Sequence, residues 1–516
     1  MAAINLFISK AVCCKSILGF KTTTTLVYIP QNLEIRGLIR QSPIPVKLCK
    51  KNIHQQADKV AILLYQIVNI QALKKSMNVA LEEGFVRLNS TILQSIVKDY
   101  KIYLQWMEAV GILECDPWYS KGSYSKAYRL GLAYRGRRIK NYVISDNVLV
   151  KKLQAGDIDL SSKAKYPKLY DDLMDLEFED FHAAINDVTS KTMRIIAQKA
   201  VSEDIKVEIR KKGKNSKYKN LNPKLLKIAK RRLCQEKINS WQNSLAKINV
   251  KQFYFKQDHT SFRLHTSAVS VKKELRKHLR INGQRLVACD IKNSQPYFSI
   301  GFFLNPGKFK ETIEHYIKYY QGTKLDWAYH AAHHMLGKFE SNYLSDSTRK
   351  YIELVSSGQF YEFIARELQK LNGKTWSREE AKKAVFDVLF CPPRFKKLPG
   401  RKVMNKYFPE VLRFFTLINY GYTKTKSQSN GKIHQGNFLA RVLQKMESQV
   451  VLDIICKQIK SKLPEIPLIT LHDGITTTIG NQYQVQQIMS VELEKFVGKP
   501  PIIEIEWEKW GIGRYP

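Results

Sequence analysis

Two aspartates far apart in the chain stand where short apolar segments end. Residues 286–289 read LVAC and Asp290 follows them directly, whereas Asp473 lies inside LITLHDGITTTI, residues 468–479. Apolar runs of this length predict buried strands, and Gly474 is expected to supply the positive φ of a tight turn between the two runs of the second stretch. If these strands are neighbours in one sheet, the carboxylates form a site for paired Mg²⁺ ions, which activate a hydroxyl and stabilise a leaving pyrophosphate.

A cationic helix is the third candidate element. The stretch WSREEAKKAVFDVLF, residues 376–390, places Glu380 three residues after Ser377, which is the pattern of a reciprocal capping box at a helix start. Side chains at every fourth position share one face of this helix: Arg378, Lys382 and Phe386. Two cations and an aromatic ring on one stripe suit a triphosphate and the sugar or base attached to it. The alternative is an ordinary surface helix with salt bridges.

The order and spacing of these elements resemble the palm and fingers of family A DNA polymerases and of their relatives, the single-subunit phage-type RNA polymerases. Motif A of that family, an aspartate ending a strand before a helix with Ser-Gln, is matched by Asp290 with Ser294 and Gln295. Motif C, His-Asp after two apolar residues, is matched by His472 and Asp473.

Motif B of the family reads R-x3-K-x7-Y-G, and Arg378 and Lys382 stand at its first two positions. Phe390 and Cys391 replace the Tyr-Gly pair. Upstream, SFRLHTS resembles the T-G-R segment of the family at Arg263. The resemblance covers roughly the C-terminal half of the chain.

The resemblance implies a role for each matched residue. It assigns the two Mg²⁺ ions to Asp290 and Asp473, and the incoming triphosphate to Arg378 and Lys382, with Lys382 also counted as catalytic. It further assigns the nucleotide to Phe386 and Phe390, and the nucleic-acid backbone or primer end to Arg263 and His472. For His472, a packed and hydrogen-bonded imidazole is an equal alternative.

Several positions depart from the family pattern. Motif A carries two extra residues, Gly474 replaces the acid that closes motif C, and no glutamate stands where DNA polymerases exclude the 2′-hydroxyl. The choice between deoxyribose and ribose substrates therefore stays open. The long amphipathic helix predicted between motifs B and C, residues 437–459, shows no clear glutamine-glycine signature.

Composition points to a polyanionic partner. The chain has 516 residues with 85 Lys and Arg against 46 Asp and Glu, a formal charge of +39. Nucleic acid is the first partner this charge predicts, and an anionic membrane surface the second. No apolar run approaches the ~18 residues that span a bilayer. The 8 cysteines show no zinc or disulfide spacing, which favours an intracellular protein, in the cytoplasm, nucleoid or an organelle matrix.

The organisation along the chain predicts four regions. These are a basic N-terminal segment (1–50), a winged-helix-like module of three helices and a hairpin turning at Lys121-Gly122 (51–135), a basic helical connector or thumb (136–250), and palm and fingers (251–516). In the connector, Lys211, Lys212 and Lys214 belong to a lysine-rich loop that suits a phosphate backbone, or else a solvated face. DLEFED, residues 175–180, is expected to be a helix-start surface.

We therefore expect an α+β protein with a right-hand polymerase-like palm, fingers and thumb. The expected function is a template-directed nucleotidyltransferase, a DNA-directed DNA polymerase without proofreading, acting with Mg²⁺ on primer-template DNA and dNTPs. A mobile or viral element is the expected context. We expect a monomer or a component of a replication complex. The alternatives are a single-subunit RNA polymerase or primase, and a non-catalytic replication initiator that binds DNA.

Overall fold

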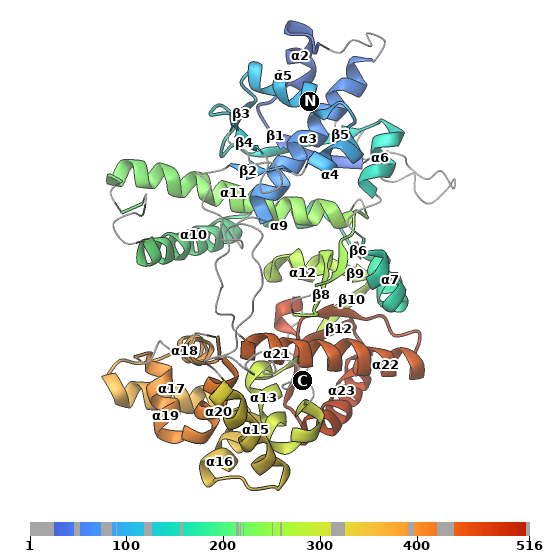
Figure 1. The fold of residues 1–516 in the computed structure, drawn as a ribbon. Helices are drawn as coiled ribbons and strands as arrows, with labels where there is room; N and C mark the ends of the chain where they lie inside the picture. The colour runs from blue at the N-terminus through green and yellow to red at the C-terminus, as the bar shows by residue number, and fades with distance from the viewer. Residues whose placement is uncertain are drawn as a thin grey trace. The chain divides into compact units, whose positions relative to one another are not determined.

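The computed structural model falls into two compact units (Figure 1). It describes residues 25–45, 52–73, 85–88, 90–117, 126–154, 158–212, 216, 218–219, 221–249, 251–258, 261–310, 326–390, 397–419 and 438–511. The first unit comprises Met1–Gly156 and Ile185–Gln252, and the second Asp157–Ala184 and Phe253–Pro516. Residues 157–184, which the sequence places in the connector, thus group with the C-terminal part of the chain.

The first unit contains three helices and a three-stranded sheet in the predicted module. The elements are α3 (Ile53–Leu73), β2 (Val86–Arg87), α4 (Ser90–Ile96), α5 (Tyr100–Ala109), β3 (Leu113–Asp116) and β4 (Ala127–Leu130). The sheet order is β2-β4-β3, with β3 and β4 antiparallel. Residues 60–65 of α3 are almost fully buried and form the middle of the core. The predicted turn at Lys121-Gly122 lies outside the described residues.

Further elements of the first unit surround this module. An antiparallel pair joins β1 (Thr25–Pro30) to β5 (Ile139–Ile144), a pairing that the sequence patterns did not predict. The helices are α2 (Ile35–Gln41), α6 (Asn147–Gln154), α10 (Lys191–Lys212) and α11 (Pro223–Asn249). A further helix, α9 (Phe181–Val188), contains the boundary between the two units, which falls after Ala184. A small apolar cluster, which includes Val201, Ile205 and Leu233, joins α10 to α11.

The second unit is built on a six-stranded sheet. Its order is β11-β12-β10-β9-β6, and β13 also pairs with β10. The strands are β6 (Leu176–Phe178), β9 (Leu279–Ile281), β10 (Gln284–Ile291), β11 (Ile469–Leu471), β12 (Gly474–Thr478) and β13 (Ile503–Glu506). A separate pair joins β7 (Phe255–Gln257) to β8 (Leu264–Thr266).

Helices make up most of the second unit. The helices that precede β10 in the chain are α7 (Leu160–Lys165), α8 (Pro167–Met174), α12 (Ser267–Ser270) and the 3₁₀ segment η4 (Lys273–His278). Next in the chain are α13 (Ser294–Leu304), α15 (Asp326–Glu340), α16 (Asp346–Ser356), α17 (Phe360–Asn372), α18 (Arg378–Phe390), α19 (Pro399–Tyr407) and α20 (Pro409–Asn419). The last are α21 (Phe438–Ser448), the π-helical segment η6 (Gln449–Cys456), α22 (Lys457–Lys462), α23 (Gln482–Val497) and the 3₁₀ segment η7 (Glu508–Trp510).

The core of the second unit gathers around α13, which is buried along almost its whole length. Phe303 of this helix packs its ring edge-on against Phe339, at 4.9 Å between centroids, and also contacts Phe414. Such aromatic pairs add about 0.5–1.5 kcal/mol each beyond area burial. This packing fixes the helix that follows β10, and with it the strand end that carries Asp290.

The segment Asp175–Asp180 differs in part from its expected structure. Leu176–Phe178 forms the strand β6, paired with β9, where the sequence predicted only a helix-start surface. The helix start is present at Asp180, whose side chain accepts from the backbone of His182 at 2.8 Å. The alternation of apolar and polar residues is too short here to predict a strand, because β6 is stabilised by its pairing with β9.

Within the described residues, every helix is too short or too polar to cross a bilayer.

Candidate functional site

The sheet of the second unit brings the two predicted aspartates to one place. Strands β10 and β12 are antiparallel neighbours, and Asp290 is directly opposite Gly474. Asp473 is therefore one residue away from the partner of Asp290, although the two aspartates are far apart in the chain. Asp290 lies inside β10, rather than just beyond the strand as expected. Both aspartates are half-buried.

Gly474 provides space at this point rather than an unusual backbone conformation. A Cβ atom at Gly474 would lie 3.0 Å from Oδ1 of Asp290 and 3.3 Å from the Cys289 carbonyl oxygen. The expectation that Gly474 supplies the positive φ of the turn is wrong, because His472 does so with φ of 63°. Histidine tolerates this conformation better than most residues. The glycine instead allows the strand to approach the Asp290 carboxylate closely.

His472 is exposed at the turn. Its ring lies 6.2 Å from the ring of His265 in an edge-on arrangement. Desolvation of the imidazole and the nearby Arg263 cation lower the pKa of His472, while Asp473 opposes the shift. A neutral imidazole therefore predominates at neutral pH.

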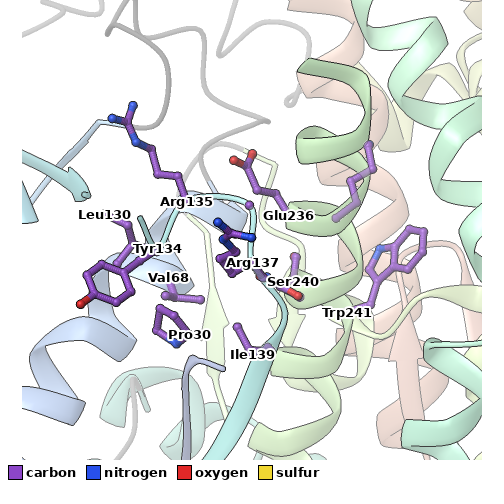
Figure 2. Close-up of a pocket in the computed structure, with 13 residues that line it drawn as sticks. Pro30, Val68, Leu130, Tyr134, Arg135, Arg137, Ile139, Glu236, Ser240 and Trp241 are labelled. Carbon is purple, nitrogen blue, oxygen red and sulfur yellow. The ribbon is translucent and has the colours of Figure 1, made fainter. Parts of the chain in front are cut away.

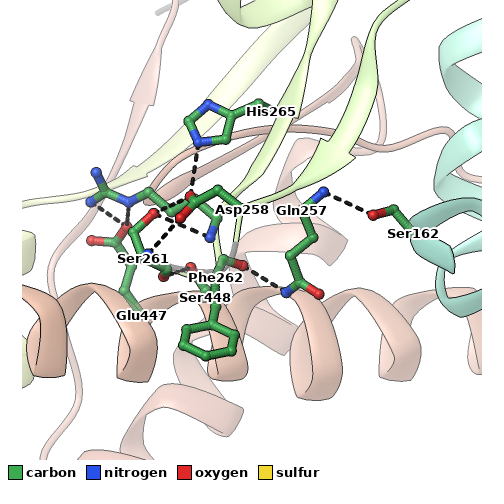
Figure 3. A network of polar contacts seen from close by, with 9 residues as sticks. Ser162, Gln257, Asp258, Ser261, Phe262, His265, Glu447 and Ser448 are labelled. Carbon is green, nitrogen blue, oxygen red and sulfur yellow. Dashed lines mark hydrogen bonds and ion pairs between the residues drawn. The ribbon is translucent and has the colours of Figure 1, made fainter. Parts of the chain in front are cut away.

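A buried carboxylate that sequence reasoning missed lies beside these residues. Glu447, near the end of α21, is fully buried and accepts hydrogen bonds from Ser294 Oγ at 3.0 Å and Gln295 Nε2 at 2.5 Å. Arg263 pairs with its other oxygen through Nε at 2.7 Å and a terminal nitrogen at 2.6 Å (Figure 3). Burial, and next the charge of Asp473, raise the pKa of Glu447 to about 7. Glu447 thus joins the start of α13 to the segment that carries Arg263.

The signal for Glu447 was present in the sequence. It falls four residues after Leu443 and three before Val450, on the apolar face of the predicted amphipathic helix. A carboxylate on such a face must be paired or neutralised. Arg263, expected on nucleic acid, is the residue that pairs with it in the structure.

Helix α18 begins as the sequence predicted. Ser377 N donates to Glu380 at 2.9 Å and Glu380 N donates back to Ser377 Oγ at 3.2 Å, which is a reciprocal capping box. The hydrogen bond from Lys374, and next the donors of Ser377, lower the pKa of the Glu380 carboxyl to about 2. Four side chains on one stripe of the helix are half-buried: Arg378, Lys382, Phe386 and Phe390.

Arg378 connects α18 to the loop after Asp290. Its Nε donates to Glu362 at 2.9 Å, and a terminal nitrogen donates to Asn293 Oδ1 at 3.2 Å. Its guanidinium also lies over the Tyr361 ring, at 5.3 Å from the centroid. Burial raises the pKa of Tyr361, Arg378 lowers it and Asp473 raises it.

The remaining stripe residues contact one another. Lys382 Nζ lies 5.7 Å from the centroid of the Phe386 ring, and the rings of Phe386 and Phe390 are 5.1 Å apart. Among the residues that the structure describes, Lys382 forms no ion pair. Its ammonium group is therefore available to an anionic ligand. Cys391, Lys214 and the side chains of Lys211 and Lys212 lie outside the described residues.

The donor set at the sheet end suits a hard divalent cation. Mg²⁺ in proteins is commonly held by one or two carboxylates together with substrate phosphates and water, rather than by a complete protein cage. Asp290 and Asp473 provide such a pair, and the missing side chain at Gly474 leaves space at Asp290 Oδ1. The described residues contain no group of three or more His, Cys, Asp or Glu side chains placed to hold a metal.

Comparison with known proteins gives little further information. No protein-family model matches the chain, and no curated protein matches it. One solved structure that aligns with it is the POL domain of Pol1 from M. smegmatis in complex with DNA primer-template and dNTP, over 70% of this chain and 73% of that one. The identity is 14% and the TM-score 0.30. A superposition at this level establishes neither a shared fold nor a shared activity.

Proposed function

We propose that this protein is a template-directed nucleotidyltransferase, and specifically a DNA-directed DNA polymerase of the family A type. The observation that carries the proposal is the register that sets Asp290 opposite Gly474, with Asp473 next to it. Two carboxylates, together with a displaceable arginine and an uncommitted lysine one turn further along the same helix, provide what phosphoryl transfer requires, namely charge neutralisation and positioning. The motif resemblance supplies the polymerase class.

In the proposed mechanism, Asp290 and Asp473 hold Mg²⁺, which would supply activation of the primer hydroxyl and neutralise charge on the triphosphate. Lys382 binds the triphosphate as a point charge, because it has no other ion pair in the described part of the chain. Arg378 exchanges its partly exposed partner Glu362 for a phosphate oxygen. Phe386 and Phe390 give the sugar and base an apolar surface.

In this proposal the palm belongs to the second unit, and the three-helix module of the first unit acts as a winged helix. The strand order β2-β4-β3, with three helices before the β3–β4 hairpin, supports that assignment. Arg263 and His472 are proposed to face the primer end. Lys211, Lys212 and Lys214 are proposed to contact the phosphate backbone.

Primer extension with single aspartate variants tests the proposal. Asp290→Asn and Asp473→Asn remove one negative charge each, and we expect each to reduce Mg²⁺-dependent incorporation by at least ~10³-fold, the scale of losing a transition-state stabilising group. Glu504→Gln is the matched control. Glu504 lies opposite Asp290 on the other neighbouring strand, β13, and its side chain is 56% exposed. DNA binding without primer extension by the unsubstituted protein would leave a DNA-binding initiator as the function, and undiminished extension by the Asp473→Asn protein would exclude this site as the source of the activity.

The same assay separates the two nucleotide pools. Purified protein given dNTPs or rNTPs on one primed DNA template should incorporate dNTPs with the higher kcat/KM. A preference for rNTPs would assign the site to an RNA polymerase or primase instead. This comparison is necessary because the chain has no glutamate at the position where DNA polymerases use one to exclude the 2′-hydroxyl of a ribonucleotide.

A further inference from the structure

A polar pocket in the first unit is lined by none of the residues assigned above. It is formed by the loop after β4 and by one face of α11, and its volume is about 180 Å³ (Figure 2). This is below the ~300 Å³ at which pockets for whole drug-sized ligands begin. It equals the volume of about six water molecules. The space therefore suits a small polar group, such as one unit of a larger chain.

The loop is held against α11 by specific contacts. Asn239 Nδ2 donates to the Arg137 carbonyl oxygen at 2.9 Å, and Gln235 donates to Asn239 at 2.8 Å. Gly136 has φ of 67°, and a Cβ there would lie only 2.2 Å from Cγ of Arg232. The glycine thus permits the loop to lie directly on the Arg232 stem, which makes the pocket a built feature of the fold.

Positive charge exceeds negative charge at this pocket. The nearby acids already have cationic partners: Glu114 pairs with Arg129 and Arg135, Glu236 with Arg232 at 3.6 Å, and Asp204 with Lys237 at 3.0 Å. Within the described residues, Arg137 forms no ion pair, and its only recorded side-chain bond is to the Ala133 carbonyl at 3.2 Å. Figure 2 shows the Arg137 guanidinium among the lining side chains, with Arg135 directed away from it.

The electrostatic environment of Arg135 agrees with this excess. Burial lowers the pKa of Arg135, and the neighbouring guanidinium groups of Arg129 and Arg232 lower it further. Repulsion among three guanidinium groups indicates a positive potential that one shared carboxylate, Glu114, does not cancel. An anion near the loop would relieve it.

We propose that this pocket binds a phosphate group of a nucleic-acid strand, with Arg137 and the hydroxyl of Ser240 as donors and with Tyr134 and Trp241 beside the sugar and base. Guanidinium is suited to phosphate because its planar donors match phosphate oxygens. Aromatic side chains near a cationic groove are the usual means of holding single strands without sequence preference. The site is distinct from the proposed catalytic site and does not depend on catalysis.

Binding of a single-stranded oligonucleotide to the full chain, followed by fluorescence anisotropy over a range of salt concentrations, tests this site. No triphosphate or Mg²⁺ is added, so failure of the polymerase proposal would not affect the outcome. We expect Arg137→Ala to weaken binding about tenfold and to reduce the slope of log K against log salt by about 1, because one phosphate contact is lost. The backbone carbonyl that holds Asn239 is retained, so the loop should keep its structure.

Arg138→Ala is the matched control. Arg138 is the next residue, is exposed and does not line the pocket. Its replacement therefore removes the same positive charge but leaves the side chains of the pocket intact. Equal effects of Arg137→Ala and Arg138→Ala on affinity and slope would overturn the proposal, because they would show only general attraction. Saturable binding of dAMP that Arg137→Ala abolishes, with an unchanged oligonucleotide slope, would also overturn it and assign the pocket to a free nucleotide.

Discussion

The two arginines of the candidate site, Arg263 and Arg378, are held in different ways. Arg263 pairs with Glu447, which is 0% exposed, whereas Arg378 pairs with Glu362, and both of those side chains are nearly 40% exposed. A buried pair is costly to break because the remaining charge cannot be hydrated. An exposed pair contributes at most about 1 kcal/mol and exchanges readily. The comparison shows that Arg263 is a fixed part of the site, while Arg378 is free to change partners.

The largest expected effect comes from breaking the buried pair. Glu447→Ala leaves Arg263 without its carboxylate and removes the acceptor of Ser294 and Gln295, so we expect a loss of about 3–5 kcal/mol in the free energy of unfolding. Glu362→Ala should cost less than about 1 kcal/mol. Urea denaturation of both variants measures the difference. Similar losses in the two variants would contradict the distinction between a fixed and an exchangeable arginine.

The pH dependence of stability gives a second, smaller effect. Because the pKa of Glu447 rises from an ordinary value near 4.5 to about 7 on folding, the folded state binds the proton more tightly than the unfolded state. Its stabilising contribution is complete below pH 4.5 and is lost as the pH rises through 7, by up to ~3 kcal/mol. Glu447→Gln, which keeps an acceptor for Ser294, should remove this part of the pH profile. An unchanged profile would show that Glu447 titrates normally.

The smallest of the three effects tests the space at Gly474. Gly474→Ala places a methyl group 3.0 Å from Asp290 Oδ1, and we expect a loss of about 1–3 kcal/mol in stability from overpacking. Displacement of Asp290 should also lower kcat in primer extension. Gly307→Ala is the control, since an added Cβ there meets nothing within 4 Å. Equal behaviour of the two variants would show that Asp290 has room to move.

Sequence reasoning performed best where the determinants are local. The capping box of Ser377 and Glu380 and the stripe from Arg378 to Phe390 depend on spacing within one helix, and both are present in the structure. The sequence suggested one sheet for the strand that leads to Asp290 and the hairpin that contains Asp473, and the structure pairs β10 with β12, the return strand of that hairpin.

Features that depend on distant partners were not predictable in the same way. Strand β6 exists because β9 pairs with it, and β1 because β5 does. The positive φ lies at His472, and Gly474 instead permits the close approach of β12 to Asp290, which a turn pattern alone does not reveal. Glu447 was missed although its place on an apolar face was visible in the sequence.

The π-helical segment η6 begins directly after the helix that carries Glu447. A π-helix closes its hydrogen bonds one residue further along the chain than an α-helix does. Deleting a single residue between Gln449 and Cys456 would allow a regular α-helix there with little rotation of the residues downstream relative to Glu447, because a π-helical turn contains one residue more than the α-helical turn that would replace it. Chain length is therefore less constrained in this segment than in the regular helices α21 and α22 on either side of it, where deleting one residue does rotate the following residues by about 100°.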